Sequence, residues 1–167
     1  MAHRGQAAVS ALRRRCGDLA RAVMDVMHAD GSVVFLPSRE MAAVEHALGR
    51  PCNQNGTRYA EGLVGLPLAA LPVTDLLLGD HAAVLHRDDA ISLLPGQPEV
   101  MALLGIETIG VVASTAHHYD LANPWRAVAS FSYTDRLQPD LASVVTVRKL
   151  LDADAADIYS LLSRVSA

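Results

Sequence analysis

The chain has 167 residues, of which 51% are hydrophobic and 19% charged, and its net charge is −4. A chain of this length is expected to form one domain, here residues 1–167, that buries about 70% of its unfolded surface. The hydrophobic fraction excludes a disordered chain, and the acidic balance argues against direct binding to nucleic acid, which requires a basic surface.

The cysteines and the apolar runs exclude further classes. Cys16 and Cys52 have neither the spacing of a zinc site nor the number that a disulfide framework needs. No uninterrupted apolar stretch reaches the ~20 residues of a membrane-spanning helix. We therefore expect a soluble, cytoplasmic protein that does not enter a membrane.

The N-terminal part predicts a helix, a strand and a short second helix. Asp30-Gly31 is a turn signal, and the apolar residues 33–36 after it predict a strand that Pro37 ends. Ser38 is placed to cap a helix over residues 38–48. The first helix is predicted over residues 7–27, because apolar side chains recur there at intervals of three and four: Val9, Leu12, Cys16, Leu19, Val23 and Met27.

The middle of the chain is rich in Gly, Pro and Asn. Residues 49–62 are expected to form a long loop, and a loop of this length in a compact domain often carries function. A helix interrupted at Pro67 is predicted next, and the short apolar run after it is ambiguous between helix and strand. The pattern then predicts a strand over residues 82–86 and a helix over 99–104, with Gly105 as its C-cap.

The C-terminal part predicts two strands and a long helix. Residues 106–114 and 126–133 have strand patterns, and the polar residues 117–124 join them as an extended hairpin loop. Pro139 is expected in the first turn of the final helix. This order of elements is α+β, with helices covering one antiparallel sheet. The stripe expected on the final helix contains Leu141, Val144, Leu151, Ala155, Ile158, Leu162 and Val165.

Several short segments together resemble a known family. They are Asn55-Gly56-Thr57, Glu61-Gly62, residues 83–86 and the strand entry at 105–112. This sequence is similar to GAF-type sensor domains, in particular the N-terminal sensor domain of bacterial activators of the acetoin- and glycerol-operon type. The resemblance implies a GAF-like sheet with long N- and C-terminal helices. A PAS-like sensor is the alternative fold, because Asp30-Gly31 also resembles the strand that opens PAS domains.

The resemblance implies a ligand pocket between the sheet and the segment 52–94. Thr108 and Ser130 belong to its floor if the register of their strands directs them inward. Haem held by one histidine is left open for His86, His117 or His118, so the cofactor is unknown, and no metal-binding motif is present. The polar contacts expected in the pocket are Tyr59, Glu61, His86, Asp88, Thr108 and Ser130.

The function implied by the resemblance is a small-molecule-sensing or signalling module. It would regulate transcription or a partner protein through a ligand-dependent conformational change. The apolar stripes of the terminal helices either pair two subunits as a homodimer or only cover the sheet of a monomer. The alternatives are a small enzyme that uses Cys52 or a histidine in the pocket, and a protein-interaction domain without ligand.

Overall fold

The computed structural model describes residues 2–37, 44–50, 56–67, 82–89, 97–115 and 126–165. These residues form helices and strands in a mixed, non-alternating order. The elements are α1 (Ala2–Met27), β1 (Gly31–Pro37), β2 (Val44–Arg50), α2 (Gly56–Leu63), β3 (Ala82–His86), α4 (Gln97–Leu104), β4 (Thr108–Ala113), β5 (Val128–Tyr133) and α5 (Leu141–Val165).

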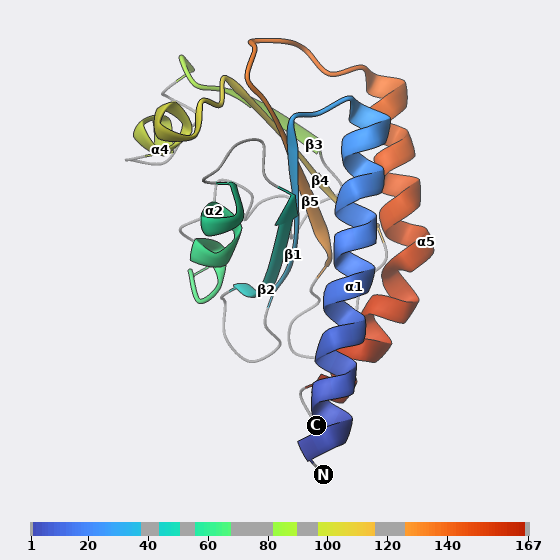
Figure 1. Ribbon diagram of the computed structural model, residues 1–167. Helices are drawn as coiled ribbons and strands as arrows, with labels where there is room; N and C mark the ends of the chain where they lie inside the picture. Colours follow the sequence, from blue (N-terminus) through green and yellow to red (C-terminus); the bar gives the residue numbers. More distant parts are fainter. Residues whose placement is uncertain are drawn as a thin grey trace.

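The five described strands form one antiparallel sheet in the order β2-β1-β5-β4-β3. The first strand therefore pairs with the last, and β5 lies at the centre. Figure 1 shows α1 and α5 side by side over one face of the sheet, with α2 and α4 on the other side. The predicted α+β class, with a helix-covered antiparallel sheet and long terminal helices, is confirmed.

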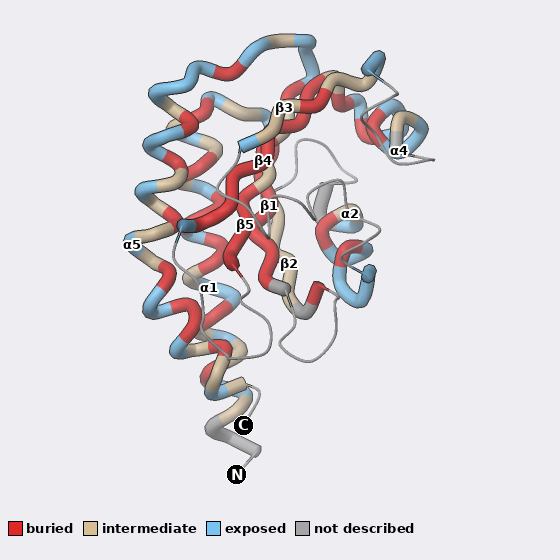
Figure 2. The backbone as a smooth tube through the Cα atoms, turned by 180° about the vertical axis from the view of Figure 1, so that it is seen from behind, coloured by how far each residue is buried: buried red, intermediate tan, exposed pale blue. Residues whose placement is uncertain are grey.

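The larger core lies between the sheet and the two terminal helices. Figure 2 shows buried residues along the inner sides of α1 and α5 and through the strands behind them. Both amphipathic helices were predicted, but Leu141 is 75% exposed, whereas Val147 and Tyr159 are buried. The strand side chains of this core are Val34, Leu36, Val112, Ala129, Phe131 and Tyr133.

Helix α5 begins at Leu141, directly after its N-cap. The Asp140 carboxylate accepts hydrogen bonds from the Ser143 backbone N–H (3.0 Å) and from the Ser143 hydroxyl (3.1 Å). Asp140 is therefore the N-cap. Pro139 lies just outside the helix, and the prediction that it occupies the first turn was wrong.

Two predictions in the middle of the chain were also wrong. The helix expected over residues 38–48 is contradicted, because Val44–Arg50 forms strand β2, paired with β1. The expected loop over 49–62 contains helix α2 from Gly56 to Leu63. Both short segments have ambiguous local patterns, and packing against the rest of the protein decides their conformation.

Other predicted elements agree with the structure. Strands β3, β4 and β5 lie within one or two residues of the predicted ranges, and α4 ends at Leu104. Gly105 has φ of 69°, the left-handed conformation expected of a C-cap glycine. The predictions for residues 68–78 and 117–124 lie outside the described residues, as does Cys52.

Cys16 on α1 is 4% exposed within the larger core. Burial, and to a lesser extent the negative charge of Asp154, raise the pKa of its thiol from 9.0 to about 12. The unfolded state therefore loses this proton near pH 9 while the folded state keeps it. We expect the free energy of unfolding to fall between pH 9 and 12, by up to ~1.4 kcal/mol per pH unit from this group alone.

Urea unfolding of the reduced protein at pH 8, 9 and 10 tests this expectation, with Cys16→Ala as the comparison. The tyrosines contribute equally to both proteins, so the variant should lose stability less steeply with pH. Equal slopes would show that the Cys16 thiol is not responsible.

Candidate ligand-binding site

The face of the sheet that looks towards α2 and α4 is mostly apolar. Strand side chains alternate between faces, and the residues directed to this side form a second buried cluster with α2 and α4. No charged side chain of β1, β4 or β5 points to this face. The positions on it are Gly31, Val33, Phe35, Ile109, Val111, Ala113, Val128, Ser130 and Ser132.

Ser130 is the polar residue at the centre of this face. Its cross-strand neighbours are Val33 on β1 and Val111 on β4, both of which are buried. Ser130 itself is only half-buried, as is Ser132 two positions along the same strand. The middle of the sheet therefore presents two hydroxyls, about 7 Å apart along the strand, within an apolar surface.

Tyr59 on α2 packs against the edge of the same cluster. Burial raises the pKa of its phenol, so the group stays protonated at neutral pH and can donate a hydrogen bond. Helix α2 lies close to β2, because a Cβ on Gly49 would be 2.8 Å from the Cβ of Ala60. Strand β1 lies between β2 and β5, so the backbones of β2 and β5 are two strand spacings, or about 10 Å, apart.

His86 and Thr108 lie on the opposite face. They are cross-strand partners on β3 and β4. The Thr108 hydroxyl donates to the Asp135 carbonyl (2.9 Å) and accepts from the Leu137 N–H (3.2 Å). Because its single proton is already donated, the 3.1 Å contact requires His86 Nδ1 to carry the proton. These residues fasten the β5–α5 connection to the sheet.

Two further residues predicted for the site lie at the surface. Glu61 is exposed on α2, and Asp88 is exposed in the turn after β3, where its carboxylate is 3.8 Å from Arg136. Of the six predicted contacts, the structure thus brings Tyr59 and Ser130 to one face of the sheet and places the other four elsewhere. His86 does not fit a haem bound on the α2/α4 face, because it lies behind the sheet.

His117, His118 and Cys52 lie outside the described residues. Within the described residues, no group of three or more His, Cys, Asp or Glu side chains could hold a metal ion.

A polar cluster that the sequence analysis did not identify ties α5 to the ends of β4 and β5. Asp152 accepts hydrogen bonds from the Ser114 hydroxyl (2.7 Å), the Thr115 N–H (2.8 Å) and the Thr115 hydroxyl. One heptad later, the Tyr159 hydroxyl accepts a bond from the Ala127 N–H (3.1 Å). In the sequence, Asp152 and Tyr159 are seven residues apart, which places both on one side of a helix. This spacing is the pattern that could have indicated the cluster.

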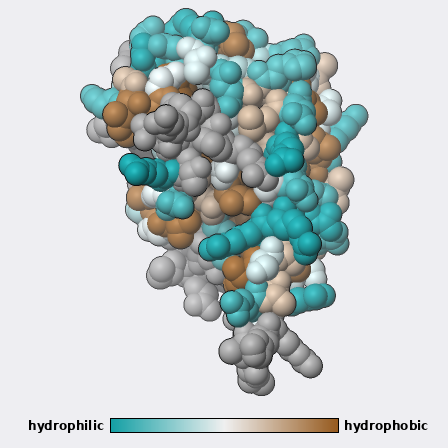
Figure 3. All heavy atoms as spheres, viewed as in Figure 1, coloured by the Kyte–Doolittle hydropathy of each residue, from teal (hydrophilic) through white to brown (hydrophobic). Residues whose placement is uncertain are grey.

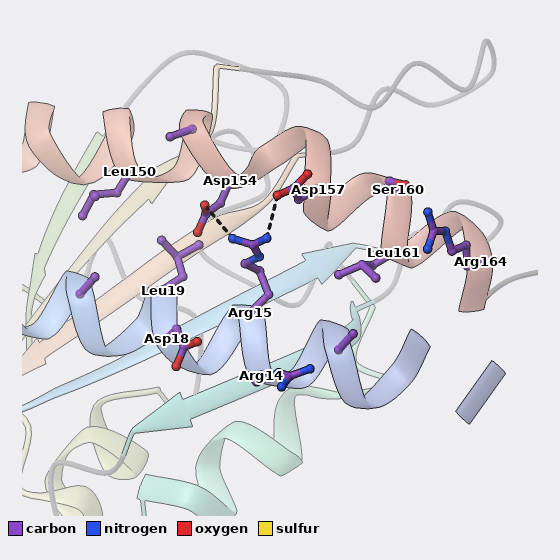
Figure 4. Close-up of a pocket in the computed structure, with 13 residues that line it drawn as sticks. Arg14, Arg15, Asp18, Leu19, Leu150, Asp154, Asp157, Ser160, Leu161 and Arg164 are labelled. Atoms are coloured by element: carbon purple, nitrogen blue, oxygen red, sulfur yellow. Dashed lines mark hydrogen bonds and ion pairs between the residues drawn. The ribbon is translucent and has the colours of Figure 1, made fainter. Parts of the chain in front are cut away.

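A groove of about 710 Å³ runs along the outer side of α1 and α5. Figure 4 shows Arg15 reaching from α1 to α5, where its guanidinium is 2.7 Å from Asp157 and 3.6 Å from Asp154. We call it the α1–α5 groove; it is lined by Ala11, Arg14, Arg15, Asp18, Leu19, Ala22, Leu150, Ala153, Asp154, Asp157, Ser160, Leu161 and Arg164.

Solved structures with the same architecture are GAF domains. A GAF domain/HD domain protein from Geobacter sulfurreducens aligns with a TM-score of 0.65 at 13% identity, covering 90% of this chain and 94% of that chain. The GAF domain of a two-component sensor histidine kinase from Bacillus halodurans aligns with a TM-score of 0.58 at 16% identity, covering 86% and 93%.

The blue-light absorbing form of the PixJ GAF domain from Thermosynechococcus elongatus gives a TM-score of 0.65 at 10% identity, covering 92% of this chain and 88% of that chain. The protein therefore has the GAF fold. No family model and no curated protein sequence matches the chain. Among the described helices, none is long and apolar enough to cross a membrane.

Proposed function

We propose that this protein is a sensory module that binds a small molecule on the α2/α4 face of its sheet. The supporting observation is the half-buried Ser130 at the centre of an apolar sheet face. Ligand sites are mostly apolar with a few polar groups that fix orientation, and Ser130 and Tyr59 are suited to that role. The uncharged strand positions around them favour a neutral effector.

The signal would leave through the terminal helices. The Asp152 and Tyr159 bonds connect α5 to Ser114, directly after β4, and to Ala127, directly before β5, and these two strands form the centre of the proposed floor. A ligand that shifts these strands would bias the position of α5. We propose that the protein acts as a homodimer through α1 and α5, and that it regulates transcription or a partner protein through contacts made by these helices.

Native mass spectrometry of the purified protein, compared with its denatured mass, tests the proposal directly. A non-covalent extra mass would identify the effector. If the protein is purified empty, thermal-shift measurements with neutral and charged metabolites should show stabilisation by a neutral compound, because a ligand that binds only the folded state raises its melting temperature.

Ser130→Ala tests the location of the site. The change removes the hydroxyl without adding bulk, and should weaken binding about tenfold. Ser10→Ala on the exposed surface of α1 is the matched control and should bind normally. If no molecule binds the wild-type protein, the proposal is overturned in favour of an interaction domain whose interior is filled by its own side chains.

A further inference from the structure

A separate cavity lies between α1 and β2, an edge strand of the described sheet. Its volume is about 270 Å³, near the lower end of the roughly 300–1,000 Å³ that is usual for small-molecule pockets. A molecule that fits it is therefore small. We call it the α1–β2 cavity; it is lined by Leu12, Arg13, Cys16, Val34, His46, Ala47, Leu48 and Val64.

The strand register places this cavity on the α1 side of the sheet. Val34 on β1 pairs with Leu48 on β2, and Leu36 pairs with His46. The side chains of directly paired residues point to the same face. Val34 and Leu36 belong to the larger core beneath the terminal helices, so Leu48 and His46 face α1 as well. The sheet therefore separates the α1–β2 cavity from the proposed effector site on the α2/α4 face.

Most of the cavity wall is apolar. Leu12 and Cys16 lie one turn apart on α1, and both are buried, as is Val34. Leu48 is partly buried against the same core, and Val64 is 49% exposed. Figure 3 shows hydrophobic and hydrophilic surface side by side along α1. Such a wall favours an apolar chain or ring, because burying apolar surface stabilises a complex.

The charge of the lining favours an anion. Arg13 is exposed and makes no ion pair with another described residue, whereas Arg15 is paired with Asp154 and Asp157. No carboxylate occurs among the described residues that line the cavity. The Cys16 thiol adds no negative charge at neutral pH, because burial raises its pKa to about 12. An anion beside Arg13 would therefore meet no like charge from the described lining.

We propose that the α1–β2 cavity binds a small monocarboxylic acid. The apolar chain or ring of the acid lies against Leu12, Val34 and Leu48, and its carboxylate binds the guanidinium of Arg13, whose planar fork matches a carboxylate. His46 adds a second polar group to the lining. This site is additional to the proposed effector site, where the uncharged strand positions favour a neutral molecule. A bound acid connects α1 to the edge of the sheet.

Anions of higher charge match the cavity less well. Phosphate groups are usually bound by clusters of arginines or by the free N–H groups at a helix N-terminus. The described lining contains one arginine. Arg13 lies well inside α1, where the backbone N–H groups are bonded within the helix. A neutral ligand, in turn, would make no use of the Arg13 charge.

Amide chemical shifts of the isotopically labelled protein test the location and the charge preference. The probes are benzoate and isovalerate, and benzamide is the neutral match of benzoate. Both acids should shift the amides of Leu12, Cys16 and Leu48 and leave that of Ser130 unchanged. Benzoate should bind several-fold more tightly than benzamide, because only benzoate can pair with Arg13. Equal affinities, shifts centred on Ser130, or no shift with either acid would overturn the proposal.

A charge-removing substitution tests the role of Arg13. Arg13→Gln should weaken the binding of benzoate about fivefold, as expected for an exposed ion pair, and leave the affinity for benzamide unchanged. Arg14→Gln is the matched control, because it removes the same charge from a neighbouring position that lines the α1–α5 groove instead. It should bind benzoate like wild type. An equal loss in the two variants would show that benzoate responds only to the net charge of α1, and the proposal fails.

Leu48→Phe tests the cavity itself. The larger side chain fills the space from an edge strand, where an aromatic residue is well tolerated. Binding of both benzoate and benzamide should be lost, while thermal unfolding shows that the fold is kept. Unchanged binding in a folded Leu48→Phe protein would place the acid elsewhere and contradict the proposal. None of these results depends on Ser130 or on a neutral effector, so this site and the proposed function can fail separately.

Discussion

Replacing Gly110 with alanine is expected to destabilise the protein by about 3 kcal/mol or more. Gly110 on β4 lies directly opposite Phe131 on β5. A Cβ at this position would be 2.0 Å from one ring carbon of Phe131 and 2.2 Å from another. The Phe131 ring is 1% exposed and packs edge-on against Tyr133, with 6.1 Å between the ring centroids. The ring therefore cannot move aside without disturbing the larger core.

Urea unfolding of Gly110→Ala measures the cost. Gly62→Ala is the matched control, because Gly62 is in helix α2 and nothing lies within 4 Å of an added Cβ. That change should be neutral or stabilise by about 0.5–1 kcal/mol. Adding Phe131→Leu to Gly110→Ala should cost less than the two single changes combined. A loss below about 1 kcal/mol for Gly110→Ala would contradict the prediction.

Asp152→Ala is expected to lower the free energy of unfolding by about 3 kcal/mol, because the hydrogen bonds to the carboxylate are lost and their donors remain without this acceptor. The Ser114 hydroxyl is fully buried, and both it and the Thr115 N–H would lose their shared acceptor. Asp154→Ala, two residues further along α5, removes only a partly exposed ion-pair partner of Arg15 at 3.6 Å. That control should cost less than about 1 kcal/mol.

Hydrogen exchange locates the effect of Asp152→Ala. The amide of Ser114, which donates to the Ala127 carbonyl at 2.9 Å, should lose protection selectively, because the cluster holds this end of β4 and β5 together. Equal stability of the Asp152 and Asp154 variants would show that the carboxylate of Asp152 does not anchor the strands.

The fold class could be predicted because the terminal helices and central strands have long, regular patterns. The conformations of the segments that form β2 and α2 could not be predicted, because their sequence patterns are short. Val44 and Leu48 are four residues apart, which fits one face of a helix, yet the segment pairs with β1. Helix α2 contains two glycines in eight residues and is held by packing of Ala60 and Leu63, which no local preference indicates.

The candidate site was harder to predict than the fold. All six residues of β4 are buried, since helices cover both faces, and the usual alternation of polar and apolar positions is absent. The sequence alone could not show that Thr108 and Ser130 point to opposite faces. In β5 the serines at 130 and 132 alternate with Phe131 and Tyr133, and this pattern did indicate which side chains share a face.

The pairing of β1 with β5, and of α1 with α5, joins the beginning of the described chain to its end. Contacts between residues this far apart in sequence are slow to form, because the intervening chain must first close into a loop. During synthesis, α1 and β1 emerge from the ribosome long before either partner exists. Their apolar surfaces remain open to chaperones or to aggregation until α5 has been made, and a chain truncated before α5 should not reach the native state.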